Sequence, residues 1–547
     1  MLDLYVAALG GRDPTRDAQR CALYEGCCDA DYLERIVSCQ AAVGLGKTTA
    51  VTRYLLGQAA RAQPPLRRLF VVAPFTNIIT QTARALRKAL VLPGEDPHEV
   101  VAEHHHRVDF ADQDHRTLAT LWRAPVVVTT AVQFFETLGA NQPADLRKFH
   151  EVPGSAIYID EAHAAIPVHL WPQCWRWLRE LADQWSCRIV LASGSLVRFW
   201  QEERVIAPTC VLPELTPEPL LRETQNTELA RVSLGDARPA DPERYSLTRS
   251  ELVERLADAT RTNGPVLAIL NTVQSAAVIA RDLAERLEGI KSDQHPHPRP
   301  LRDRQVLHLS TALTPRDRQA ILEEIERRQG AAAADYILVA TSIVEAGVDL
   351  DFQSAFRERA SVAAFIQTSG RVNRHGLRTG AALHTFQLEH DDLLKAHPAF
   401  RESASVFDQF WPQLLAGHCP GDLATNAMSH ELDRHGGIHE QLSAAEVAAD
   451  YPRVAKLCRV IDSDTCVVVV DDDLRRRLEL YEHVPFKNLQ AGSVQLWAAK
   501  IDKLALPASP LFTDVYLWND AYDRFLLGIM AGLLRTEAGG ASGAFLG

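Results

Sequence analysis

The residues best suited to chemistry lie in a short stretch near the N-terminus. Residues 41–48 read Ala-Ala-Val-Gly-Leu-Gly-Lys-Thr, which fits a phosphate-binding loop with alanine in place of the usual first glycine. In such a loop, backbone N–H groups face a β-phosphate, the Lys47 ammonium reaches the β- and γ-oxygens, and the Thr48 hydroxyl binds Mg²⁺. The candidate ATP-binding residues here are Gly44, Leu45, Gly46, Lys47, Thr48 and Thr49. Because this pattern also arises by chance in chains rich in glycine and alanine, it needs support from other segments.

A pair of carboxylates supplies a metal ligand and a proton acceptor, which a phosphate-binding loop alone lacks. Asp160 and Glu161 directly follow the apolar run 156–159. Asp160 can hold Mg²⁺, and Glu161 can accept a proton from an attacking water while the metal bridges the β- and γ-oxygens. Ser193 and Ser195, which follow another apolar run, are candidates for coupling nucleotide turnover to movement. Together these residues predict hydrolysis of ATP with Mg²⁺ as the metal.

Two arginines in the second half of the chain could neutralise the charge that develops on the γ-phosphoryl group. Arg371 and Arg374 are three apart, which would place them on one helical face. Together with Gln367 and Glu161 they are the candidate catalytic residues, and Gly347 and Asp349 fit the ribose side of the nucleotide. The alternative is that both arginines lie on the surface of an ordinary helix. If they act on ATP, the site is expected to be complete only when two domains close.

Apolar runs that alternate with helical patterns must position these residues. Five runs occur in the first part of the chain and three in the second, at 35–39, 69–74, 125–130, 156–159, 188–192, 266–271, 306–311 and 336–341. Such runs predict doubly wound parallel sheets, in which ligands bind at the carboxyl ends of the strands. We therefore expect an α/β protein with two tandem RecA-like domains at 1–205 and 248–392. A linker at 206–247 would join them, and a mixed C-terminal accessory domain would occupy 393–547.

Polar residues also end several of these strands or open the loops that follow. The candidates for contacts to nucleic-acid phosphates are Pro74, Thr76, Thr130, Asn271, Ser310 and Thr341. Phosphate contacts fix the register of a strand without reading its sequence. Each of these residues fits a helix cap or a turn equally well.

Other conspicuous residues have plainer interpretations. Gln19 precedes the loop at a spacing suited to an adenine edge, or it is a polar surface residue. The run 104–106, three histidines, is expected in a solvated loop rather than at DNA or a metal. Trp171 and Trp175, with Trp177 close behind, are expected to pack a helix on the sheet rather than to stack bases.

Composition sets outer limits on the class of protein. With 547 residues, 46% hydrophobic and 23% charged, the chain is an ordinary globular protein of several domains. No apolar run approaches the ~20 residues of a membrane span, so no membrane partner is expected. Ten scattered cysteines without a C-x-x-C pair indicate reduced thiols and a cytoplasmic location. A net charge of −12 argues mildly against coating duplex DNA but permits a narrow, locally basic groove.

The order of the motifs resembles that of superfamily 2 helicases. Segments 41–48, 160–163, 193–195 and 367–374 correspond to motifs I, II, III and VI. Further segments, among them 129–136, 308–311, 344–352 and 370–376, make residues 15–390 similar to the CRISPR-associated helicase of type I interference. Ala42-Val43 departs from the Pro-Thr that is common in this loop, but every ligand-bearing residue is kept.

This resemblance implies ATP-dependent translocation along single-stranded DNA and recruitment by a crRNA-guided surveillance complex of the Cascade type. Most members carry an HD nuclease domain before the helicase. Lys47 leaves no room upstream for a domain of about 200 residues, and His390-Asp391 lacks the spaced partners of a metal site. We therefore expect a helicase whose nuclease is a separate HD protein.

Other functions stay open at this point. A general DExH helicase acting on RNA, or in DNA restriction or repair, would show the same motifs. A nucleotide-binding regulatory module without turnover is a second alternative, against which the intact Lys47, Asp160, Glu161, Arg371 and Arg374 argue. A divergent nuclease within the C-terminal domain is a third, and we expect none.

Overall fold

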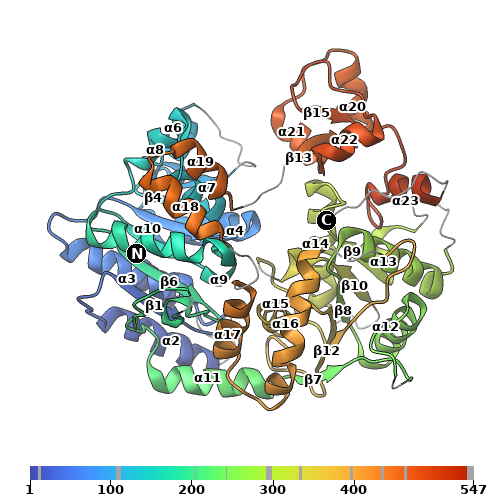
Figure 1. Cartoon of the computed structure of the whole chain (residues 1–547), viewed down its shortest axis with the longest axis horizontal. Helices are drawn as coiled ribbons and strands as arrows, with labels where there is room; N and C mark the ends of the chain where they lie inside the picture. Colours follow the sequence, from blue (N-terminus) through green and yellow to red (C-terminus); the bar gives the residue numbers. More distant parts are fainter. Residues whose placement is uncertain are drawn as a thin grey trace. The chain divides into compact units, whose positions relative to one another are not determined.

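A computed structural model (Figure 1) describes residues 1–9, 14–42, 44–105, 113–203, 205–241, 243–290, 299–331, 336–345, 347–394, 398–432, 437–460 and 465–538. The chain forms two compact units. The first contains residues 1–229 and 410–462, and the second contains residues 230–409 and 463–547.

A six-stranded sheet is the centre of the first unit. Its strands are β1 (Ile36–Gln40), β2 (Leu69–Ala73), β3 (Val101–His104), β4 (Val126–Thr130), β5 (Ala156–Ile159) and β6 (Arg188–Ser193). They lie in the order β1-β6-β5-β2-β4-β3, and every pairing is parallel. All residues of β1, β2, β4 and β5 are buried. Burial on both faces explains why these strands are mostly apolar instead of alternating; the polar residues among them are Ser38, Gln40, Thr129 and Thr130.

Helices surround this sheet. In chain order they are α1 (Leu2–Ala7), α2 (Pro14–Asp29), α3 (Lys47–Arg61), α4 (Thr76–Leu90), α5 (Pro97–Val100), α6 (Gln113–Thr120), α7 (Ala131–Leu138), α8 (Pro143–Phe149), α9 (Ala162–Ala165), η1 (Val168–Leu170), α10 (Trp171–Asp183), η2 (Phe199–Gln201) and α11 (Glu218–Ala230). The later segment adds α17 (Pro420–Leu432), α18 (Ile438–Val447) and α19 (Tyr451–Leu457).

The second unit contains another six-stranded parallel sheet. Its strands are β7 (Ser233–Asp236), β8 (Val266–Ile269), β9 (Val306–Leu309), β10 (Ile337–Ala340), β11 (Ser354–Glu358) and β12 (Ala382–Phe386), in the order β7-β12-β11-β8-β10-β9. Its helices are α12 (Arg249–Asn263), α13 (Val273–Glu288), η3 (Leu301–Asp303), α14 (Pro315–Gly330), η4 (Ser342–Val344), α15 (Val362–Ser369) and the larger part of α16 (Pro398–Leu415), whose residues 410–415 belong to the first unit. The core of this unit is formed by apolar residues of β8, β9, β10, α12 and α13.

A small mixed sheet completes the second unit. β13 (Thr465–Val469) pairs antiparallel with β14 (Ser493–Trp497) and parallel with β15 (Val515–Leu517). The accompanying helices are α20 (Asp472–Glu479), α21 (Phe486–Ala491), α22 (Ala498–Leu504) and α23 (Met530–Ala538). Trp518 and several residues of β13 and β14 belong to the same hydrophobic core as α12 and α13.

The fold class predicted from the sequence is confirmed, with two doubly wound parallel sheets and a mixed C-terminal sheet. The compact units divide the chain at other places than the sequence patterns suggested. Residues 206–247, expected as a linker, contain α11 and β7, and Leu220 on α11 is buried. The expected accessory segment 393–547 is shared between the two units. Among the described residues, no helix has the length and apolar character needed to cross a membrane.

Candidate active site

The phosphate-binding loop connects β1 to α3, as its sequence predicts. Gly44 and Gly46 have positive φ angles of 82° and 78°, which a side chain would strain. The Lys47 ammonium donates to the carbonyl oxygen of Ala41 at 2.9 Å, and the Thr49 hydroxyl donates to that of Gly46 at 2.8 Å. The tight turn therefore ends at the first residue of a helix whose N–H groups can face an anion.

Sheet order brings three strand ends together beside this loop. β6 pairs with β1 on one side and with β5 on the other. The loop follows β1, Asp160 follows β5, and Ser193 is the last residue of β6. Ligands of parallel sheets bind at this edge. The structure thus places the candidate metal, catalytic and coupling residues of the first unit side by side.

Asp160 lies in a nearly enclosed environment with 9% of its surface exposed. The Tyr158 hydroxyl donates to Asp160 Oδ1 at 2.8 Å, and the backbone N–H of Glu161 donates to the same oxygen at 3.1 Å. Burial raises the pKa of Asp160 to about 6, with repulsion from Glu161 adding to the shift and the Lys47 ammonium opposing it. A nearby cation would stabilise the ionised form of a carboxyl group in this position.

Mg²⁺ fits the oxygen groups at this point. The hydroxyl of Tyr158 interacts with both Asp160 and Thr48, so the two candidate metal ligands lie around one side chain. Hydroxyl and carboxylate oxygens are ligands that Mg²⁺ accepts. Bound there, the metal would supply positive charge to the β- and γ-phosphates.

Glu161 is held by a short hydrogen-bonded chain. The Ser193 hydroxyl donates to Glu161 Oε2 at 2.7 Å, and His163 Nδ1 lies 2.8 Å from the same hydroxyl oxygen. Because the hydroxyl hydrogen is directed at Glu161, the Nδ1–H of His163 donates. Burial lowers the pKa of His163, which keeps the ring neutral. The backbone N–H of Ser195 also donates to Ser193 Oγ, at 3.2 Å, so Ser193 links the catalytic candidate to the next loop.

The backbone of Glu161 is itself unusual. Its φ angle is 45°, a left-handed conformation that a residue with a long side chain rarely adopts and that clusters at functional sites. The turn directs the carboxylate of Glu161 toward β6 while Asp160 stays next to β5. One backbone conformation thus gives two adjacent carboxylates different surroundings.

Two arginines at this site have no counterpart among the predictions. Arg20 on α2 donates from Nε to the carbonyl oxygen of Gly44 at 3.0 Å. A Cβ on Gly44 would come within 3.0 Å of the Arg16 guanidinium, so Arg16 lies against the same loop. Their i,i+4 spacing just before the loop is the sequence signal that could have identified them. Gln19, between them, donates to Glu223 Oε1 at 2.7 Å, which favours the interpretation as a polar surface residue.

In the second unit, the structure brings Gly347, Asp349, Arg371 and Arg374 together. Arg371 is 7% exposed and donates to the carbonyl oxygens of Val344 and Glu345 at 3.1 and 2.7 Å. Arg374 pairs with Asp349 at 3.1 Å.

The expected common helical face of the two arginines is wrong. α15 ends at Ser369, and Asn373, between Arg371 and Arg374, has a left-handed φ of 47°. Its amide holds this turn by donating to the Arg378 carbonyl and accepting from the Arg378 N–H, at 2.9 and 2.8 Å. Gln367 lies in the last turn of α15 and is half-buried.

The candidate nucleic-acid contacts differ in how far their side chains are already engaged. Thr130 caps α7 by accepting from the Gln133 N–H at 3.0 Å, and Ser310, fully buried, accepts from the Ala312 N–H at 3.2 Å. The Asn271 amide accepts from Arg357 at 2.6 Å. Thr341 is 7% exposed, while Pro74 and Thr76 are half-buried at the start of α4. All six assignments stay predictions.

The remaining conspicuous residues are resolved by their packing. Trp171 and Trp175 are buried, with Trp171 stacked on Phe199 at 5.0 Å and Trp175 on Trp200 at 6.0 Å, so the packing interpretation is confirmed for these two, while Trp177 is half-buried.

The solvated loop expected at 104–106 is wrong for His104, the last residue of β3. Its Nδ1 accepts from Trp122 Nε1–H at 2.9 Å, and burial lowers its pKa to about 3. His106 lies outside the described residues. In the parts of the chain that the structure describes, no three His, Cys, Asp or Glu side chains are grouped to hold a metal ion.

Comparisons with known proteins match both halves of the chain. A DEAD/DEAH box helicase family model matches residues 17–202, and a model for the C-terminal part of the CRISPR-associated nuclease/helicase Cas3 matches residues 262–377. The CRISPR-associated nuclease/helicase Cas3 of Haloferax volcanii is 24% identical over 390 residues, 57% of this chain and 41% of that protein. The chain therefore spans less than half the length of this curated relative.

Solved structures share the fold. T. fusca Cas3 with AMPPNP has a TM-score of 0.62 at 17% identity, covering 95% of this chain and 69% of that one. T. fusca Cas3 with ADP gives the same score and identity, covering 97% and 73%. A chain of a CRISPR RNA-guided surveillance complex in a pre-nicking state has a TM-score of 0.55 at 16% identity, covering 94% and 68%. The sequence matches fall on the segments that carry the strand-end motifs, so in these segments the chain is similar to DEAD/DEAH box helicases and to the C-terminal part of Cas3.

Proposed function

We propose that this protein is an ATP-driven single-stranded DNA translocase that unwinds target DNA in type I CRISPR interference. The observation that carries the proposal is the arrangement of Lys47, Asp160 and Glu161 at neighbouring strand ends, with Ser193 bonded to Glu161. The match to a Cas3 protein named a nuclease/helicase supports the cellular role.

Each residue of the first unit has a defined part in this proposal. Lys47 and the loop N–H groups bind the β- and γ-phosphates, and Thr48 and Asp160 hold Mg²⁺. Glu161 accepts a proton from the attacking water. General-base catalysis by a positioned side chain typically accelerates such a reaction by ~10²–10⁴-fold. Protonation of Glu161 changes its hydrogen bond with Ser193, and because the backbone N–H of Ser195 donates to the Ser193 hydroxyl, this change is passed to the loop at Ser195.

The decisive experiment measures ATP hydrolysis by the full chain with single-stranded DNA, RNA or duplex DNA as activator. We expect single-stranded DNA to stimulate hydrolysis most. Lys47→Ala should abolish turnover, whereas Lys88→Ala, an exposed lysine on α4, should leave it unchanged. Strong stimulation by RNA alone would favour a general DExH helicase instead. A Lys47→Ala protein that still supported interference in cells would favour a nucleotide-binding regulatory module.

We also propose that the protein works in the cytoplasm with a crRNA-guided surveillance complex and a separate HD nuclease. A solved neighbour is a chain of a CRISPR RNA-guided surveillance complex in a pre-nicking state, and the curated relative is named a nuclease/helicase. Binding of the purified chain to surveillance complex carrying an R-loop tests the first partner. Metal-dependent DNA cleavage by the chain alone would contradict the second.

A further inference from the structure

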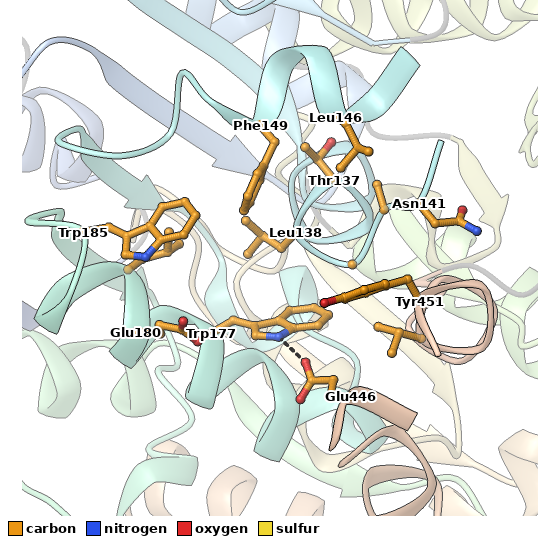
Figure 2. A pocket seen from close by; sticks show the side chains of 14 residues that line it. Thr137, Leu138, Asn141, Leu146, Phe149, Trp177, Glu180, Trp185, Glu446 and Tyr451 are labelled. Carbon is orange, nitrogen blue, oxygen red and sulfur yellow. Dashed lines mark hydrogen bonds between the residues drawn. The ribbon is translucent and has the colours of Figure 1, made fainter. Parts of the chain in front are cut away.

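A concave apolar surface on the first unit has no part in nucleotide binding. It is a cavity of about 540 Å³ formed by the end of α7, by α8, by α10 and the residues after it, and by α18 and α19. Figure 2 shows Trp177 between Trp185 and Tyr451, with Phe149 on the opposite side. All of its walls belong to one compact unit.

The fold holds this cavity in a fixed shape. Glu446 on α18 accepts from the Trp177 ring N–H at 2.8 Å and from the Gln173 amide at 2.7 Å, and it also pairs with Arg176. A Cβ on Gly139 would lie 2.3 Å from Cys458 Sγ, so the end of α7 meets the residue after α19 closely. The aromatic walls are therefore positioned before any ligand arrives.

The size and rim of the cavity suit several side chains of a partner. A cavity of about 150 Å³ holds one benzene ring, so 540 Å³ has room for about three such groups. Leu146 and Tyr451, the former above the latter in Figure 2, are 46% and 60% exposed. Large apolar side chains exposed around a hollow mark an interaction site.

The charged side chains that line the cavity are acidic, which favours a partner with a positive charge. Its lining contains Glu180 and Glu446 but no lysine or arginine. Glu446 is paired with Arg176, and the nearby Arg179 is paired with Asp183 at 2.8 Å. Glu180 is exposed, and within the described part of the chain its carboxylate has no partner. Sites that stack bases of single strands line them with cations, so this cavity is unsuited to nucleic acid.

We propose that this cavity is a docking site for a peptide segment of another protein that carries an arginine or lysine among apolar side chains. The apolar side chains fill the space between Phe149, Leu146 and Trp185. The cation lies over the ring faces of Trp177 or Tyr451 and pairs with Glu180. Cations over aromatic rings and charge-assisted pairs with carboxylates are both favourable. This inference is independent of ATP turnover.

The test is selection of short random peptides displayed on phage against the full chain, followed by affinity measurements with the purified peptides. Enriched peptides should share a lysine or arginine flanked by apolar residues. Tyr451→Ala should weaken their binding by about tenfold, the size expected for loss of a desolvated cation–π contact. The matched variant Tyr481→Ala, whose residue is 71% exposed on another surface, should bind as the parent does.

Charge removal on the ligand tests the role of Glu180. Replacing the basic residue of a selected peptide by glutamine should raise the dissociation constant for the parent protein. The ratio of the dissociation constants of the two peptides should be about tenfold smaller for Glu180→Gln than for the parent. For Glu326→Gln this ratio should equal that of the parent. The proposal would be overturned if the enriched peptides lacked a basic residue. It would also be overturned if Tyr451→Ala bound all of the enriched peptides as tightly as the parent does. Weaker binding of oligothymidine to Tyr451→Ala, with peptide binding unchanged, would identify a nucleic-acid site instead. ATP hydrolysis should be unchanged in all four variants, which shows that each is folded.

Discussion

Replacing Arg357 by methionine tests how the second unit holds the residues around Arg371. Arg357 lies on β11 with its side chain 2% exposed. It donates to Glu345 Oε1 at 2.8 Å, to Asn271 Oδ1 at 2.6 Å and to the Glu358 carbonyl at 2.7 Å. Since Arg371 donates to the carbonyl of Glu345, this buried cation supports the same backbone that positions Arg371.

The expected loss of stability follows from the burial of Glu345. Removing one member of a buried ion pair leaves an uncompensated charge and costs about 3–5 kcal/mol. Burial already raises the pKa of Glu345, and Arg357 opposes that shift. Without Arg357 the folded pKa rises further above the unfolded value of 4.5. When the pKa of a carboxyl is higher in the folded than in the unfolded protein, its protonated form contributes to the free energy of unfolding. This contribution is complete below the unfolded pKa and is lost as the pH rises through the folded pKa. The deficit of the variant should therefore be small in acid and full at neutral pH.

Native-state hydrogen exchange of the amides in β8 and β11 measures this loss locally, which suits a protein of two units. The matched control is Arg261→Met, because Arg261 and its partner Asp258 are 55% and 73% exposed and such pairs contribute ~0–1 kcal/mol. Adding Glu345→Gln to Arg357→Met should recover part of the loss, since the carboxylate that Arg357 had paired with is then replaced by a neutral side chain. The reasoning fails if Arg357→Met costs no more than Arg261→Met, or if the added glutamine recovers nothing.

Four further outcomes are expected. Glu161→Gln should lower the rate of ATP hydrolysis by ~10²–10⁴-fold while fluorescent-nucleotide titration shows unchanged binding. Because a ligating carboxylate must be deprotonated and the pKa of Asp160 is raised to about 6, Mg²⁺ affinity measured by titration should fall as the pH drops through 6. Ser193→Ala should reduce strand unwinding, followed by fluorescence, more than it reduces hydrolysis. Gly139→Ala should lower the unfolding free energy by ~1–3 kcal/mol through overpacking, and Cys458→Ala, which removes the sulfur 2.3 Å from the new Cβ, should restore it.

The buried strands were the part of the fold that the sequence predicted best. β2 and β5 are continuous apolar runs and β4 is apolar up to Thr129, and all three strands are buried along their whole length. β7, with the sequence Ser-Leu-Gly-Asp and no fully buried residue, lies at the edge of its sheet. Edge strands need not be apolar on both faces, so β7 had no such signal. The division into units also escaped prediction, because contacts between residues distant in the chain leave no local pattern.

At the site, the sequence yields candidates where a residue type in a given pattern has one main chemical use. Lys47 and Asp160 are candidates of this kind; the structure places them at neighbouring strand ends, and their roles stay predictions. Arg20 was not, because an arginine on a surface helix is common and only the fold brings it to the Gly44 carbonyl. The turn at Asn373 was missed for a related reason, since its left-handed conformation depends on bonds to Arg378 and the Arg231 carbonyl.

The engaged strand-end side chains narrow where nucleic acid can be held. Thr130 and Ser310 each accept a backbone N–H, which fixes the hydroxyl oxygen and leaves its O–H to donate to a phosphate, whereas Asn271 is bonded on both sides of its amide. α4 differs, because no side chain caps its first turn at Phe75. Uncapped first-turn N–H groups are suited to phosphate oxygens, and Phe75, 40% exposed, offers a ring on which a base can stack. Of the six predicted contacts, the two that flank Phe75 therefore combine an uncapped helix start with an exposed ring, which suits them to binding a strand better than Asn271.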